Sequence, residues 1–268
     1  MELGIRGKRV LVTGSSRGTG AVIVEHFARE GALVFVHGLQ ASEAQHTIAE
    51  GLRGAGFAAH ALSGDIRTDE GADQVVQELQ PHTDGIDILI NNYGAPASGD
   101  WHTATSAQWI DVYQQNVLSA VRMIDRFVPG MRTRRWGRVI QLATIGAIRP
   151  NKRMPHYYAA KGAMANLTAS LVKDVAGTNI TVNTVSPGLI HTPEVEASFR
   201  ALAQKRGWGD DWNEIEARGV ELLMPNPTGR LARREEVADL VAFVASERAS
   251  YLNGVHLRID GGATDLAF

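Results

Sequence analysis

Cysteine is absent from the 268-residue chain, so disulfide bonds and thiolate metal sites are excluded. Long apolar runs are missing as well, and none approaches the roughly 20 residues that a membrane-spanning helix needs. A surplus of one charge is also lacking, because 27 basic residues stand against 29 acidic ones. Nucleic acid and membranes are therefore not expected partners, and we expect no metal site.

The N-terminal stretch MELGIRGKRVLV lacks the apolar run and the small-residue cleavage site of a signal peptide. We therefore expect a cytoplasmic protein. The composition, with 44% hydrophobic and 21% charged residues, is ordinary for a globular protein. The length suits one large α/β domain or two small ones.

Short apolar runs alternate with segments of helical spacing along most of the chain. Helices are expected over residues 20–30, 42–53, 68–79, 106–131 and 155–176, and Pro129 should disturb the last turn of the fourth. Strands are expected over residues 8–12, 32–38, 57–62, 86–92, 137–144, 179–187 and 255–262. This alternation predicts an α/β fold: a single doubly wound Rossmann domain over residues 1–268, whose seven-stranded parallel sheet carries helices on both faces.

One segment interrupts the alternation between the sixth and seventh strands. Residues 193–228 contain helical patches, two tryptophans (Trp208 and Trp212) and a Pro-Asn-Pro turn. Because the segment follows the carboxyl end of a strand, we expect it to form a lid over a substrate site.

A glycine-rich turn, TGSSRGTG, follows the first expected strand and opens the first expected helix. Such a turn lets a pyrophosphate approach the backbone, and the helix N-terminus supplies N–H donors and a positive dipole. The strand–turn–helix context favours a dinucleotide site over a plain turn.

Several motifs occur in an order that resembles the short-chain dehydrogenase/reductase family along nearly the whole chain, including its 3-oxoacyl-carrier-protein reductases. They are TGSSRGTG, Asp65-Ile66, NNYG at residues 91–94, Asn116, Tyr157-x-x-x-Lys161, SPGLIHT at residues 186–192 and the closing DGG. The resemblance implies the fold predicted above, a nicotinamide dinucleotide cofactor and a ketone–alcohol oxidoreductase.

Two neighbouring tyrosines, Tyr157 and Tyr158, compete for the catalytic role. The family pattern selects Tyr157, which shares a helix face with Lys161 four residues later, whereas Tyr158 is rotated by about 100° and is expected to pack or to line the pocket. A phenol can protonate the oxygen of a carbonyl that accepts hydride. We expect Lys161 and an oxidised nicotinamide to lower the pKa of Tyr157, and Lys161 to bind the nicotinamide ribose.

Two further catalytic residues follow from the resemblance. Thr144 stands thirteen residues before Tyr157, where the family usually has a serine that binds the substrate oxygen, and its hydroxyl has the same donor capacity. Asn116 matches the asparagine that holds a water beside the lysine. The alternatives are a β-branched residue at a strand end and a solvated helix residue.

The choice of cofactor depends on the end of the second strand. Gly38 stands where an acidic residue would favour NAD, and Leu39 stands where some NADP enzymes have arginine. Arg17 is the remaining candidate for the 2′-phosphate, with support from His37 or Ser42, although it could equally be solvated surface. We expect NADP(H), with NAD(H) as the alternative.

The other cofactor contacts are implied by the resemblance. Asp65 and Ile66 should flank the adenine, Asn92 should lie near the cofactor, and a loop after the sixth strand should hold the nicotinamide. Tyr93 replaces a usual alanine and puts a bulky ring nearby. The expected cofactor-binding residues are Gly14, Ser16, Arg17, Gly18, Thr19, Gly20, Asp65, Ile66, Asn92, Tyr157, Lys161, Pro187, Gly188, Ile190 and Thr192.

Three functions remain open from the sequence. The first is an NAD(P)(H)-dependent oxidoreductase that interconverts a ketone and a secondary alcohol. The second is a 3-oxoacyl thioester reductase specifically, although the lid tryptophans suggest a bulky or aromatic ketone unless they pack within the lid. The third is a non-catalytic dinucleotide-binding regulator, which would not need Tyr157 and Lys161.

Small residues are frequent on the helix over residues 155–176, and they permit close helix approach. The resemblance implies that this helix pairs with a second copy in a homodimer or homotetramer. Close packing within one subunit is the alternative.

Overall fold

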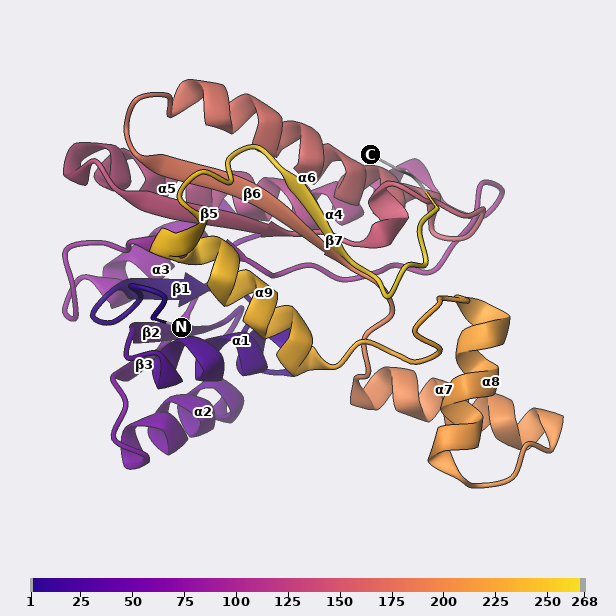
Figure 1. Cartoon of the computed structure of the whole chain (residues 1–268). Helices are drawn as coiled ribbons and strands as arrows, with labels where there is room; N and C mark the ends of the chain where they lie inside the picture. The colour runs from indigo at the N-terminus through magenta and orange to yellow at the C-terminus, as the bar shows by residue number, and fades with distance from the viewer. Residues whose placement is uncertain (1, 266–268) are drawn as a thin grey trace.

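Seven strands pair in parallel in the order β3-β2-β1-β4-β5-β6-β7, and helices cover both faces of the sheet (Figure 1). This computed structural model describes residues 2–265. The predicted fold class is confirmed, and each predicted strand is found within a few residues of its expected bounds. The strands are β1 Arg9–Val12, β2 Leu33–Gly38, β3 Ala59–Ser63, β4 Ile88–Asn91, β5 Gly137–Leu142, β6 Ile180–Pro187 and β7 His256–Ile259.

Two hydrophobic clusters lie between the sheet and the helices, one on each face of the sheet. The first cluster joins α1, α2 and α9 to one face, and the second joins α3, α5 (Ser119–Arg134) and α6 to the other. Strand side chains alternate between the two clusters: Val10 and Val12 enter the first and Leu11 enters the second. The helices are α1 Gly18–Arg29, α2 Glu43–Gly54, α3 Asp69–Leu79, α6 Pro155–Asp174 and α9 Arg234–Ala245.

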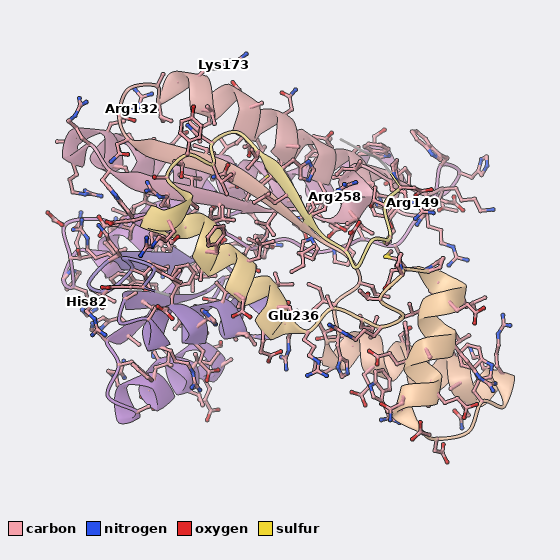
Figure 2. All side chains as sticks on the ribbon, viewed as in Figure 1. His82, Arg132, Arg149, Lys173, Glu236 and Arg258 are labelled. Atoms are coloured by element: carbon pink, nitrogen blue, oxygen red, sulfur yellow. The ribbon has the colours of Figure 1, made fainter. Side chains whose placement is uncertain are left out.

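Charged side chains project from the outer surfaces of these helices. Lys173 and Arg132 are examples (Figure 2). Arg132 pairs with Asp174 at the end of α6. No helix within residues 2–265 is long and apolar enough to cross a bilayer.

The long helix predicted over residues 106–131 is continuous but contains a π turn. It consists of α4 Ser106–Tyr113, a π-helix over Gln114–Leu118 and α5 Ser119–Arg134. The expectation that Pro129 disturbs the last turn is wrong, because α5 continues for five residues beyond it. Phe127, Val128 and Met131 are buried on both sides of the proline, so packing holds the turn despite the missing N–H donor.

The segment between β6 and α9 forms a helical hairpin of α7 Pro193–Arg206 and α8 Trp212–Leu223. The hairpin lies beyond the carboxyl ends of β6 and β7 (Figure 1). It has a small core of its own, formed by buried Phe199, Ala203, Ile215 and Val220 together with Leu231. Helix α9 was not predicted from the sequence.

Candidate active site

The carboxyl ends of β1 and β4 meet at the centre of the sheet, where the chain changes the direction in which it adds strands. Open α/β sheets bind ligands at such a switch point. The glycine-rich turn follows β1, and the segment NNYG begins at the last residue of β4. The motifs singled out in the sequence therefore lie on both sides of one crevice.

The glycine-rich turn presents the N-terminus of α1 to this crevice. Arg17 is the N-cap residue, its side chain does not cap the helix, and the first turn contains no acidic residue. A Cβ atom on Gly20 would lie 2.5 Å from Asn92 Nδ2, which donates to the carbonyl oxygens of Thr13 (2.9 Å) and Gly14 (3.2 Å). Glycine at this position therefore lets Asn92 fix the turn, and the helix N-terminus remains able to receive an anion.

A cavity of about 490 Å³ opens in front of the turn, and we call it the turn cavity. Four of the predicted cofactor-binding residues, Gly14, Ser16, Arg17 and Asn92, line it. Ser42 lines it from the loop after β2. The hydroxyl of Ser42 donates to Gln45, so its proton is already engaged.

Arg67 also lines the turn cavity, which the sequence reasoning missed. Its guanidinium donates to Asp65 through Nε (2.8 Å) and Nη2 (2.7 Å), and these hydrogen bonds hold the pKa of Asp65 below its usual range. The side chain of Ile66 is buried in the core, so only its backbone can face a ligand. The position of Arg67, two residues after Asp65, was the available signal.

Two residues at the end of β2 differ in what they offer the turn cavity. His37 is fully buried, and both its ring nitrogens have backbone partners, so the expectation that it supports a phosphate is wrong. Gly38 lines the cavity, and a Cβ atom there would lie 2.8 Å from Gln45 Oε1. An acidic side chain at position 38 would therefore displace Gln45.

Tyr93 lies half-buried against the turn and lines the same cavity. A Cβ atom on Gly14 would be 3.0 Å from Tyr93 Cα, and the Tyr93 N–H donates to Thr13 Oγ1 at 3.0 Å. Burial raises the pKa of its phenol. The bulky ring therefore forms a wall of the turn cavity.

Tyr157 and Lys161 lie one turn apart on α6, with Lys161 Nζ 5.9 Å from the centre of the Tyr157 ring. Lys161 Nζ donates to the carbonyl oxygen of Leu142, the last residue of β5, at 2.9 Å. A Cβ atom on Gly94 would lie 2.9 Å from Lys161 Nζ and 2.4 Å from Asn116 Oδ1. The ammonium and the amide oxygen therefore flank the same glycine.

Asn116 is placed by the π turn of the long helix. Its Nδ2 donates to the carbonyl oxygens of Ala95 (3.1 Å) and Val112 (3.0 Å), which points Oδ1 toward Gly94 and Lys161. π turns often occur at functional sites because they redirect one side chain. The structure thus brings the predicted Asn116, Tyr157 and Lys161 together.

Burial dominates the acid–base properties of this group. It raises the pKa of Tyr157 to about 12, with a smaller contribution from Tyr158, and it lowers the pKa of Lys161 to about 8. The expected lowering of the tyrosine pKa is therefore absent from the chain alone, because desolvation of the buried phenol is the largest effect and Tyr158 acts in the same direction. At neutral pH the phenol keeps its proton.

Thr144 and Tyr158 complete the surroundings of Tyr157. Thr144 lies just beyond β5, and its Oγ1 accepts from the N–H of Gly146 at 3.3 Å, so its own proton can still be donated. The ring of Tyr158 packs on Gly146, and its hydroxyl accepts from Asn151 at 3.2 Å. Tyr158 is a packing residue, as expected.

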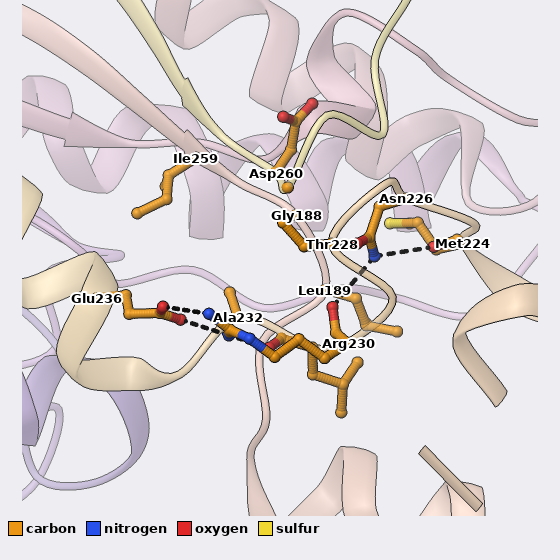
Figure 3. Close-up of a pocket in the computed structure, with 12 residues that line it drawn as sticks. Gly188, Leu189, Met224, Asn226, Thr228, Arg230, Ala232, Glu236, Ile259 and Asp260 are labelled. Carbon is orange, nitrogen blue, oxygen red and sulfur yellow. Dashed lines mark hydrogen bonds and ion pairs between the residues drawn. The ribbon is translucent and has the colours of Figure 1, made fainter. Parts of the chain in front are cut away.

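The loop expected to hold a nicotinamide connects β6 to the hairpin. Pro187 ends β6, Ile190 forms an isolated bridge with Ala232, and Thr192 caps α7 by accepting from the N–H of Val195 at 3.3 Å. Gly188 lines a smaller cavity of about 160 Å³ at the base of the hairpin, beside the Arg230–Glu236 ion pair (2.6 Å) (Figure 3).

Both tryptophans of the hairpin pack within it. The Trp212 ring stacks on His191, with centroids 4.9 Å apart and planes at 17°, and Arg200 lies 5.2 Å from its centre. Trp208 packs against the hairpin core. The packing alternative raised from the sequence therefore describes Trp208, whereas Trp212 also lines a cavity of about 420 Å³ together with His191 and Arg230.

Known proteins are similar to this chain in both sequence and fold. The sequence profile described as short chain dehydrogenase matches residues 8–203. A 3-oxoacyl-[acyl-carrier-protein] reductase of Pseudomonas aeruginosa is 33% identical over 97% of this chain and 98% of its own length. The L-sorbose reductase of Gluconobacter frateurii, solved with NADPH and L-sorbose, superposes with a TM-score of 0.92 at 34% identity, covering 99% of this chain and 100% of that one.

A 3-oxoacyl (acyl-carrier-protein) reductase of Agrobacterium tumefaciens with NADP bound is similar too, with a TM-score of 0.85 and 32% identity over 97% of this chain and 96% of its own. The chain therefore belongs to the short-chain dehydrogenase family of NAD(P)-dependent oxidoreductases.

Proposed function

We propose that the protein is an NADP(H)-dependent oxidoreductase that interconverts a ketone and a secondary alcohol. One observation carries the proposal: the Lys161 ammonium and Asn116 Oδ1 flank Gly94, which lines the turn cavity, and the Tyr157 ring lies 5.9 Å from that ammonium. The reducing group and the proton donor would then lie on either side of a single carbonyl.

The chemistry divides between the cofactor and the side chains. When bound, the reduced nicotinamide supplies the hydride that reaches the carbonyl carbon. Thr144 donates its hydroxyl proton in a hydrogen bond to the carbonyl oxygen, and Tyr157 transfers its proton to that oxygen as negative charge develops. Lys161 stabilises the resulting phenolate, and its N–H groups not used by Leu142 can bind the ribose. Oxidation of the alcohol reverses these transfers.

The preference for NADP(H) is supported by the charges around the turn cavity. Among the described residues Arg17 has no ion pair, whereas the charge of Arg67 is balanced by Asp65. The charge of Arg17 acts on the carboxylate of Glu194 but is not held in a direct ion pair, so its guanidinium can bind a 2′-phosphate. The L-sorbose reductase was solved with NADPH and the Agrobacterium reductase with NADP, which favours the same cofactor.

The test is an absorbance assay of NADPH and NADH oxidation with L-sorbose, a 3-oxoacyl thioester and simple aromatic ketones. We expect turnover with NADPH on one of these classes. The Tyr157→Phe variant should lose at least 1,000-fold in kcat and still bind NADPH. A variant that turns over at the wild-type rate would reject the catalytic assignment. Binding of NADPH without turnover of any carbonyl by the wild type would favour the regulator.

The 3-oxoacyl thioester reductase remains the second candidate function. It is favoured by the likeness to acyl-carrier-protein reductases over nearly the whole chain. Trp208 packs against the hairpin core, and one face of the Trp212 ring is taken by His191, so the tryptophans do not by themselves favour an aromatic ketone over this substrate. The relative kcat/KM of a 3-oxoacyl thioester and L-sorbose decides between an acyl and a sugar substrate.

We also propose that the protein forms a homodimer or homotetramer through the long helices. A groove of about 670 Å³ runs between α5 and α6, where Val121, Leu167 and Leu171 present apolar side chains. Nearby, Leu118 remains 37% exposed and Ile110 on α4 65% exposed. An apolar groove flanked by exposed aliphatic side chains is what a matching copy of the same helices would cover.

Light scattering after size-exclusion chromatography tests this interface. Ser170 lines the groove and is exposed, so Ser170→Arg should dissociate the oligomer without disturbing the fold. Its neighbour Ala169 is also exposed but lies outside the groove lining, so Ala169→Arg serves as the matched control. A monomeric wild type, or equal behaviour of both variants, would contradict the proposal.

A further inference from the structure

A buried histidine lies directly beneath the turn cavity. His37 is the second-last residue of β2, and its side chain is 0% exposed. Its Nδ1 accepts from the N–H of Gly14 at 3.0 Å, and its Nε2 lies 3.0 Å from the carbonyl oxygen of Gly64. A carbonyl oxygen only accepts and a backbone N–H only donates, so a neutral ring with its proton on Nε2 satisfies both partners.

The backbone of His37 also forms hydrogen bonds with the same turn. Its N–H donates to Ser15 Oγ at 2.9 Å, and the Ser15 N–H donates back to the carbonyl oxygen of His37 at 2.9 Å. Ser15 Oγ in turn donates to the carbonyl oxygen of Val12 at 2.7 Å. His37 and Ser15 therefore tie the turn after β1 to the end of β2, and Gly64 extends this connection to the end of β3.

These bonds join two of the segments that line the turn cavity. Gly14, Ser16 and Arg17 belong to the wall after β1, while Gly38 and Leu39, which follow His37, belong to the wall after β2. The separation and orientation of the walls thus depend on a side chain that does not itself line the cavity.

We propose that His37 is a positioning residue for the dinucleotide: through its neutral Nε2–H form it holds the Gly14 N–H and sets the spacing of the walls that receive the adenosine phosphate half. This inference rests on the proposed function. Burial lowers the pKa of His37 to about 4, although the Gly64 carbonyl and the carboxylates of Glu78 and Asp65 act in the opposite direction. The ring therefore remains neutral across the physiological range.

Two amide substitutions separate the two bonds of the ring. His37→Asn places an amide near the position of Nδ1, where its oxygen can accept from Gly14 but cannot reach Gly64. His37→Gln places its amide near Nε2, where it can donate to Gly64 and leaves Gly14 without a partner. We expect His37→Asn to stay within about threefold of wild type in the NADPH dissociation constant, and His37→Gln to weaken binding at least tenfold.

The measurement is quenching of NADPH fluorescence, together with KM and kcat for NADPH at saturating carbonyl. For His37→Gln we expect a rise in KM for NADPH and a kcat within twofold of wild type. The melting temperatures of His37→Gln and His37→Asn should agree with each other. Equal NADPH affinity of His37→Gln and wild type would overturn the inference. A wild type that does not bind NADPH would instead overturn the proposed function.

A spectroscopic readout on the wild type covers the case in which a variant does not fold. Nitrogen-15 spectra of histidine-labelled protein should show the His37 ring neutral, with its proton on Nε2, from pH 8 to pH 5.5 and both with and without NADPH. A proton on Nδ1 in either state would overturn the inference, because Nδ1 would then be unable to accept from Gly14.

Discussion

Two arginines line the turn cavity, and they differ in whether a carboxylate pairs with their guanidinium. Arg67 is balanced by Asp65, whereas Arg17 has no ion pair among residues 2–265. We expect Arg17→Gln to lower kcat/KM for NADPH roughly tenfold, about 1.4 kcal/mol, and to leave kcat/KM for NADH nearly unchanged, because only NADPH carries a 2′-phosphate. Steady-state kinetics with both cofactors measures the ratio.

The control for this prediction removes a balanced pair from the same cavity. The double variant Asp65→Asn, Arg67→Gln deletes one charge of each sign and should shift the NADPH to NADH ratio by less than threefold. If it shifts the ratio as much as Arg17→Gln does, the available charge on Arg17 is not the cause of the preference.

The protonation of Tyr157 makes the two reaction directions respond differently to pH. Burial raises the pKa of its phenol to about 12, so the proton donor needed for reduction is present throughout the neutral range. Alcohol oxidation needs the phenolate, so its kcat/KM should rise as the pH increases from 6 to 9. Reduction should stay nearly flat over pH 6 to 8, and pH–rate profiles in both directions measure the contrast. A reduction rate that falls steeply below pH 8 would show that another group supplies the proton.

At the scale of elements, the α7–α8 hairpin behaves as a unit because Trp212 joins its parts. Trp212 is the first residue of α8. Its ring contacts His191, which precedes α7, and two residues of α7, Phe199 (6.3 Å between centroids) and Arg200. We expect Trp212→Ala to raise amide hydrogen exchange in α7 and α8 at least tenfold and to raise KM for the carbonyl, if the hairpin is the lid.

The same variant should leave exchange in α1 and the dissociation constant for NADPH within twofold of wild type. This expectation follows because the hairpin has a core separate from those that join the helices to the sheet. Increased exchange throughout the sheet would show that the hairpin is not an independent unit.

At the scale of the whole molecule, buried histidines make the fold sensitive to mild acid. The pKa of His37 falls from 6.5 in an unfolded chain to about 4 in the fold, so between these values the unfolded chain binds more protons. Stability is therefore complete above pH 6.5 and falls as the pH decreases toward 4. The loss from His37 alone between pH 8 and pH 5 is about 2 kcal/mol.

Urea unfolding at pH 8 and pH 5 measures this loss. The His37→Asn variant should lose about 2 kcal/mol less than wild type between the two pH values, whatever its stability at pH 8. His60 and His256, whose pKa values burial also lowers, are present in both proteins and cancel in the comparison. An equal loss in the two proteins would mean that His37 accepts a proton without cost.

The sequence predicts this molecule best where a pattern is local. The strands and their parallel direction follow from short apolar runs separated by helical segments, and the placing of Tyr157 beside Lys161 follows from a spacing of four on one helix. The partners of side chains depend on distant segments and were not predictable: the pairing of His37 with Gly14 and Gly64 spans 23 and 27 residues. Helix α9 was not predicted, although buried Val237, Val241 and Val244 recur at helical spacing. Arg67 was not predicted as a residue of the site, although it lies two residues after Asp65.

Two short segments connect the hairpin to the rest of the fold, and a β-bridge between Ile190 and Ala232 pairs them. Grafting residues 193–228 from a relative with different substrate preference onto this chain should therefore carry that preference over while the response to NADPH stays as it was. That outcome would show that the proposed lid sets the choice of substrate separately from the source of reducing power.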